Sequence, residues 1–168
     1  MQRKFFLQSL SLGAAGLMIP GLSKAQTQQQ QPEPLPIAQV KDFVIAGHGN
    51  FDKVKQMLAE MPALLYATFD WGKGDFETAL EGAGHVGNKE IANFLIAQGA
   101  RTNVFVMTML GKTTVVKPFL EAFPSYLTAK GPHGFTLLHH AQKGGEDARE
   151  LLEFIKSRGQ TETRLSLS

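Results

Sequence analysis

Two adjacent histidines, His139 and His140, are the first candidates for metal or proton-transfer chemistry in this sequence. They fall in residues 136–142, where the spacing of apolar residues predicts a helix. Neighbouring helix residues point about 100° apart, so the pair cannot easily hold one ion. We therefore expect structural roles for the pair in place of a shared metal site. His133 lies in a predicted exposed turn, where it either meets a partner together with His140 or faces water.

The only tryptophan, Trp71, lies in a predicted loop with charged residues on both sides. Large aromatic side chains on such loops often anchor a binding surface. Alternatively, Trp71 folds down and covers apolar surface beneath the loop. Glu81 lies on the next predicted helix, either toward a binding groove or simply in solvent. The candidate partner-binding residues are Asp70, Trp71, Phe76, Glu81, His133 and His140.

No arrangement typical of an enzyme accompanies these residues. The chain has no cysteine, which excludes disulfides, thiolate metal sites and a cysteine nucleophile. It has no nucleophile-elbow motif, and its glycines fall in predicted turns, not in a phosphate-binding loop. We expect a non-enzymatic protein with no catalytic residues, no metal site and no cofactor.

The elements that carry the candidate residues are helix pairs that repeat along the chain. Apolar residues at three- and four-residue spacing follow each of four glycines, Gly49, Gly87, Gly111 and Gly144, and this spacing predicts one apolar helix face. A shorter helix is predicted before each glycine, at residues 40–46, 78–85, 105–110 and 136–142. The predicted fold class is therefore all-α, a helix–turn–helix unit repeated four times.

Two of these units resemble ankyrin repeats, whose pattern is Thr-Pro-Leu-His-x-Ala, a glycine turn, an apolar helix and Gly-Ala. The matching residues are Thr78, Leu80, Ala83, Gly87, Gly99 and Ala100 in the second unit and Gly134, Thr136, Leu138, His139 and Ala141 in the fourth. Ala79 and Leu137 replace the family proline, and Glu81 replaces the histidine in the second unit. The resemblance implies an ankyrin-type solenoid over residues 37–159 that binds another protein on a concave face.

The spacing of the turn glycines is uneven, which predicts two irregularities in this solenoid. Too few residues separate Gly99 from Phe105 for a finger, so the third unit should enter its first helix directly. Residues 66–76 form an enlarged, aromatic finger loop instead. Pro118 falls inside the second helix of the third unit, where it should remove a hydrogen bond and bend the axis.

Residues 1–25 are predicted to be a signal peptide, with a basic start, an apolar run and a small-x-small cleavage site that ends at Ala25. Residues 3–7 resemble a twin-arginine export motif in which Lys4 replaces the second arginine; the alternative is an ordinary secretion signal. Both place the protein in the periplasm or outside the cell. Residues 26–36 are a predicted Gln/Pro-rich linker, and residues 160–168 a predicted flexible tail.

The charge of the chain argues against a nucleic-acid partner. Without the three basic residues of the signal peptide, 14 basic residues face 15 acidic ones, and no basic run remains. We expect another protein as the partner, no membrane span after signal removal, and a monomer, because four repeats can be stable alone. The alternatives are a small-ligand or metal-binding accessory protein of an exported enzyme, using His133 and His140, and a partner of a folded cofactor enzyme.

Overall fold

The computed structural model describes residues 32–167, so the predicted signal peptide and most of the predicted linker lie outside the described residues. From Pro34 onward the chain forms one compact unit. This unit is mostly helical, as the sequence predicts. Among residues 32–167, no helix combines the length and apolar character needed to cross a membrane.

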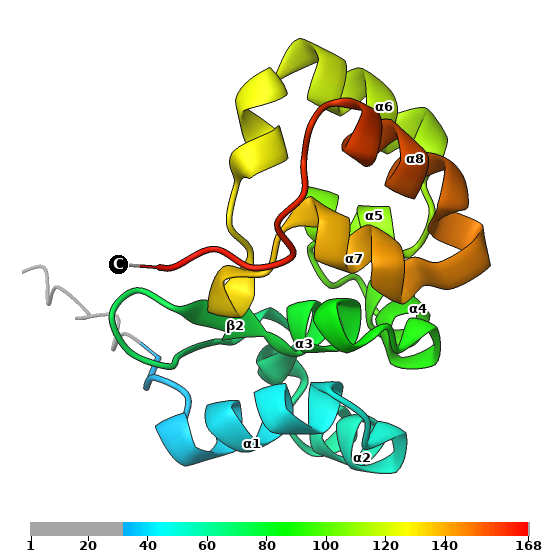
Figure 1. The fold of residues 1–168 in the computed structure, drawn as a ribbon. Coiled ribbons are helices and arrows are strands. Elements are labelled where there is room, and N and C mark those ends of the chain that lie inside the picture. Colours follow the sequence, from blue (N-terminus) through cyan, green and yellow to red (C-terminus); the bar gives the residue numbers. More distant parts are fainter. Residues whose placement is uncertain (1–31, 168) are drawn as a thin grey trace, which may run out of the picture. The chain divides into compact units, whose positions relative to one another are not determined.

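Helices follow one another in four pairs, and the first helix of each pair contacts the first helix of the next pair (Figure 1). The first helices are α1 (Ile37–Gly47), α3 (Ala79–Val86), α5 (Val104–Met109) and α7 (Leu137–Gly144). The second helices are α2 (Phe51–Glu60), α4 (Lys89–Ala97), α6 (Thr113–Ala122) and α8 (Arg149–Ser157). Short 3-10 helices are η1 (Pro62–Tyr66), η2 (Pro124–Thr128), η3 (Pro132–Gly134) and η4 (Gly145–Ala148).

Side-chain caps explain where most of these helices begin. Each cap accepts a hydrogen bond from the backbone N–H three residues later, an interaction that contributes about 1 kcal/mol. The capping residues are Asn50, Thr78, Asn88, Asn103 and Thr136. At its other end, α3 stops at Gly87, whose φ of 85° is the left-handed conformation that glycine adopts without strain.

The buried apolar side chains form two clusters that share α5. The first joins the first two helix pairs, with Phe43, Leu80 and Ile91 among its members. The second joins the last two pairs, with Leu137 and Leu151 among its members. Because α5 contributes residues to both, the four pairs are held in one continuous stack.

The finger loop of the second unit contains a short antiparallel hairpin, the only strand pair in the described part of the chain. Strand β1 (Thr68–Asp70) pairs with β2 (Phe76–Thr78), with Phe69 opposite Glu77. The third unit has no such finger, because only six residues separate α4 from α5. As a result, η3 and α7 of the fourth unit reach α3 of the second unit directly.

The C-terminal segment differs from the flexible tail that the sequence predicts. Its backbone is hydrogen-bonded to the turn before α7: Leu165 N–H donates to Gly134 O, and Thr136 N–H donates to Thr163 O. The guanidinium of Arg164 also donates to the backbone oxygen of His133 at 2.7 Å. A short polar sequence such as this one has no apolar pattern that predicts packing. Its order therefore becomes visible only from the backbone hydrogen bonds to the turn.

Candidate metal centre

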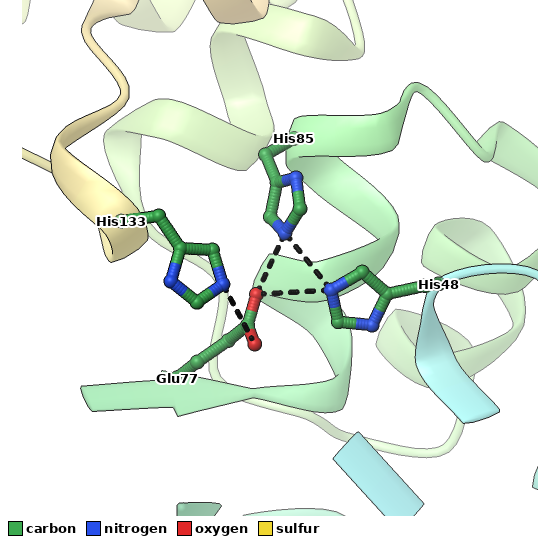
Figure 2. A group of neighbouring side chains, drawn as sticks. All are labelled: His48, Glu77, His85 and His133. Carbon is green, nitrogen blue, oxygen red and sulfur yellow. Dashed lines mark hydrogen bonds and ion pairs between the residues drawn. The ribbon is translucent and has the colours of Figure 1, made fainter. Parts of the chain in front are cut away.

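Four side chains from three parts of the chain converge beside the finger hairpin (Figure 2). They are His48, Glu77, His85 and His133, and one ligand atom from each lies within 4.8 Å of the others. His85 Nε2 is 2.8 Å from Glu77 Oε1 and 3.0 Å from His48 Nε2. His48 Nε2 lies 3.4 Å from Glu77 Oε1, and His133 Nε2 lies 3.4 Å from Glu77 Oε2.

His48 and His85 occupy nearly equivalent positions, one residue apart in register, in consecutive helix pairs. Each follows an Ala-Gly pair at the C-terminal part of a first helix, in Ala46-Gly47-His48 and in residues 83–85. A Cβ atom on Gly47 would lie only 2.3 Å from the backbone oxygen of Ala79, so α1 and α3 approach closely at this point. The stacking of α1 on α3 thus places His48 and His85 side by side, and the centres of their imidazole rings are 4.8 Å apart.

Glu77 is the central residue of β2, and its side chain is fully buried. Its neighbour Phe76 points outward and is 55% exposed, so this short strand reverses the usual burial of apolar and charged residues. Trp71 Nε1–H donates to Glu77 Oε2 at 2.8 Å. Burial alone would raise the pKa of Glu77, but hydrogen bonds with His48 and His85 and their charges outweigh it and lower that pKa to about 2. The carboxylate is therefore ionised at neutral pH.

His133 comes from the turn before α7, where its backbone has a left-handed φ of 57°. Few non-glycine residues adopt this conformation, so surrounding contacts must hold it. Asp75 in the finger supplies them, because its two carboxylate oxygens accept from the backbone N–H of His133 at 2.8 Å and from Nδ1–H at 2.7 Å. Arg164 binds the backbone oxygen of the same residue.

These outer contacts determine which ring nitrogens face the centre. His48 Nδ1–H donates to the backbone oxygen of Val44, and His133 Nδ1–H donates to Asp75. In a neutral imidazole whose Nδ1 carries the proton, Nε2 has a free lone pair. When neutral, His48 and His133 therefore present Nε2 lone pairs toward Glu77, the arrangement found in proteins where histidine binds a metal.

Without a cation, the close pairs of atoms at the centre require a proton on one of the ring nitrogens, which the Nε2–H tautomer of a neutral His85 supplies. Two Nε2 atoms 3.0 Å apart can form a hydrogen bond only if one of them is protonated. The hydrogen bond with Glu77 raises the pKa of His48 above its ordinary value, although burial opposes the shift. A divalent cation would supply positive charge to all four ligand atoms at once and displace that proton.

The spacing of the ligand atoms is compatible with a bound metal ion. Tetrahedral ligands about 2.0–2.1 Å from zinc lie roughly 3.3 Å from one another. The closest pairs here span 2.8 to 3.4 Å, and all four ligand atoms lie within 4.8 Å of one another, so a bound ion would require the shortest pairs to separate by a few tenths of an ångström and the widest to close. No known protein family, curated protein or solved structure matches this chain.

The candidate residues from the sequence lie in different environments. Trp71 and His133 belong to the cluster or contact it, whereas Phe76 points to solvent. Asp70 Oδ1 accepts from the N–H of Gly72 and so stabilises the finger turn. Glu81 completes a capping box with Thr78 and also accepts from Asn103 at 2.7 Å, so its carboxylate is not simply solvated.

His140 is not part of the cluster, so its predicted pairing with His133 is wrong. Its ring is buried against Phe105, and Nδ1–H donates to the backbone oxygen of Thr136. His139 Nε2–H donates to the backbone oxygen of His85 at 2.8 Å, a structural role of the kind expected for it. The two adjacent rings thus serve different parts of the fold.

Sequence reasoning missed three of the four cluster residues, His48, Glu77 and His85. One signal was present: Ala-Gly-His occurs twice, 37 residues apart, at the ends of two predicted first helices. In a stack of helix pairs, residues at corresponding places in consecutive pairs are neighbours. For Glu77 the sequence gives a weaker indication of a functional role. Its burial depends on the hairpin, and the sequence predicts this region only as a finger loop.

Proposed function

We propose that this protein is a binding domain for a first-row divalent transition metal, with His48, Glu77, His85 and His133 as ligands. The observation that carries this proposal is the convergence of three imidazole nitrogens and one carboxylate oxygen within 4.8 Å. Imidazole-rich sites suit zinc, copper, iron and nickel, whereas calcium and magnesium prefer oxygen ligands alone. Hydrogen bonds from the outer shell support this use of the site, because they orient two of the rings and the carboxylate.

The same proposal includes the architecture and the location of the protein. We infer an ankyrin-type solenoid, supported by the order of the helix pairs, the threonine caps of α3 and α7 and the left-handed Gly87. We also infer export from the N-terminal sequence pattern. A site made of imidazole and carboxylate suits an oxidising compartment, because it contains no thiolate that oxidation would consume.

Metal titration of the purified protein after chelator treatment tests the proposal. Calorimetry with Zn(II), Co(II), Cu(II), Ni(II) and Mn(II) should show one equivalent bound for at least one of these ions. His85→Ala should weaken binding by about 100-fold or more, since loss of even an outer-shell partner typically costs 10–100-fold. Glu77→Gln keeps the shape of the side chain but removes its charge, and should also weaken binding strongly.

His139→Gln is the matched control for these variants. It removes a histidine outside the cluster, and the glutamine amide can still donate to the backbone oxygen of His85. Its metal affinity should therefore equal that of the unmodified protein. Equal and weak binding by the unmodified protein, His85→Ala and Glu77→Gln would mean that the cluster is only a buried hydrogen-bonded network.

Protein binding is a second candidate function, favoured by the exposed aromatic ring of Phe76 on the finger hairpin. We propose that this finger contacts a partner protein in the cell envelope. A partner captured from an envelope extract should be lost with Phe76→Ala and kept with Val115→Ala, which shortens a similarly exposed side chain on α6. Retention of the same partner by both variants would contradict a role for the finger.

A further inference from the structure

The cluster of four proposed metal ligands is shielded from solvent on one side and open to solvent on the other. Glu77 has no exposed side-chain surface and His85 has 9%, whereas His48 and His133 have 29% and 22%. A pocket of about 260 Å³ lies on the open side, lined by His48, His133, Ile45 and Trp71. Two of the four proposed metal ligands are therefore walls of a pocket that solvent can enter.

The pocket suits a small molecule. Pockets for drug-sized ligands typically measure about 300–1,000 Å³, so this one is smaller than that range. Ile45 on α1 and the ring of Trp71 supply apolar walls beside the two imidazoles. A ligand that fits must therefore combine one donor atom for the metal with a compact apolar body.

Charge around the pocket favours an anion. One carboxylate, Glu77, binds a divalent ion and leaves a net positive charge at the centre. The ammonium of Lys41 adds a second positive charge, since it lies 5.8 Å from the centre of the Trp71 ring. The nearby carboxylate of Asp75, which accepts two hydrogen bonds from His133, offsets one of these positive charges, so the metal, Glu77, Lys41 and Asp75 together leave one net positive charge.

We propose that the metal keeps an exchangeable position facing this pocket, where a small monoanion with an apolar body, such as a carboxylate, replaces a bound water molecule. This inference rests on the metal-binding function proposed above. Three imidazoles and one carboxylate leave room for a fifth ligand on ions that accept five or six ligands. The anion donates a lone pair to the metal, and the departing water carries no charge away.

Cobalt(II) is the probe that separates the two proposals. Its visible absorption reports metal binding first, through the appearance of bands in the chelator-treated protein. Addition of azide and then of benzoate to the cobalt-loaded protein should change these bands with saturation at one equivalent of anion. Benzoate should bind more tightly than acetate, because its ring contacts the apolar walls.

Ile45→Glu is the matching variant, because it replaces an apolar wall with a negative charge and removes no metal ligand. It should leave cobalt affinity within about threefold but weaken benzoate binding about tenfold or more through charge repulsion and lost apolar contact. Val115→Glu makes the same change at an equally exposed position on α6 and should alter neither affinity.

The outcomes are distinguishable. Cobalt bands that do not respond to azide or benzoate would leave the metal site in place and overturn the exchangeable position. Equal anion affinity in Ile45→Glu and Val115→Glu would overturn the pocket as the point of entry. Absence of cobalt binding would overturn the metal function itself, and the anion proposal with it.

Discussion

Gly82 on α3 leaves the space in which the imidazole ring of His48 lies. A Cβ atom at this position would be 2.8 Å from Cε1 and 2.9 Å from Nδ1 of that ring, closer than real contacts allow. The ring is the end of a side chain and can move away, whereas the backbone of α3 need not change. Position 82 therefore controls the placement of a metal ligand more than it controls the fold.

Gly82→Ala should consequently weaken metal binding about tenfold, a typical cost of disturbing the orientation of a ligand. The free energy of unfolding of the metal-free protein should stay unchanged or increase slightly, because alanine is favoured over glycine within a helix by about 1 kcal/mol. Calorimetry and urea unfolding measure the two quantities. Gly49→Ala is the control, since its Cβ would meet nothing within 4 Å. Equal metal affinity in both variants would contradict the argument.

His140 is a second residue with a measurable electrostatic effect, independent of the metal. Burial is the main cause that lowers its pKa from 6.5 to about 4. In the unfolded chain this histidine takes up a proton near pH 6.5, so the unfolded state binds more protons between pH 6.5 and 4. Its contribution to stability is thus present above pH 6.5 and is lost as the pH falls toward 4.

The shift corresponds to about 3 kcal/mol at 1.36 kcal/mol per pKa unit. We expect the free energy of unfolding, measured with chelator present, to fall by about this amount over that pH range. His140→Leu should remove most of this dependence, although the lost bond to Thr136 lowers stability at every pH. A variant with an unchanged slope against pH would show that other groups cause the loss.

At the scale of elements, the turn before α7 depends on the C-terminal segment. Residues 163–165 are hydrogen-bonded to this turn, and Arg164 also places its guanidinium 5.2 Å from the centre of the Phe135 ring. The turn carries His133 in a left-handed conformation. Its hydrogen-bond partners on both sides, Asp75 and Arg164, therefore fix the position of one metal ligand.

Arg164→Ala should lower metal affinity severalfold, up to about tenfold, because it frees the backbone oxygen of His133. Helical content measured by circular dichroism should not change. Arg158→Ala is the control, since Arg158 is an exposed arginine that contacts Glu121 and Phe154 outside the site. An affinity loss of equal size in both variants would contradict a specific role of Arg164. A charge effect alone would raise the affinity in both, because each variant loses a cation that repels the metal.

At the scale of the whole molecule, the proposed metal would join three of the four helix pairs. His48 comes from the first, Glu77 and His85 from the second and His133 from the fourth. A ligand that binds only the folded state stabilises it by about 2.7 kcal/mol at a concentration 100 times its Kd. Such a link would also reinforce the direct contact between the second and fourth helix pairs.

We therefore expect the Tm of the protein to rise by roughly 8–12 °C when the metal is present at 100 times its Kd. Differential scanning calorimetry with and without metal measures the shift. Glu77→Gln should show little or no shift, because its affinity for the metal is lost. A shift of equal size in Glu77→Gln would mean that the metal stabilises the protein at another place.

The helix pairs follow from local signals in the sequence. Apolar spacing and turn glycines such as Gly87 predict helices and their ends, because these signals act within a few residues along the chain. The capping role of Thr78 and Thr136 was equally local and is present in the structure. The enlarged finger and the missing finger of the third unit followed from chain length alone.

The meeting of His48, Glu77, His85 and His133, in contrast, depends on how the helix pairs pack. Their sequence separations reach 85 residues, and no local pattern encodes contact over that length. The meeting depends on the close approach of α1 and α3 at Gly47 and on the missing third finger, which lets the fourth unit reach the second. His140 is also a histidine and has another histidine beside it in the sequence. It lies on the side of α7 that faces the core, so its ring is buried there and does not reach the cluster.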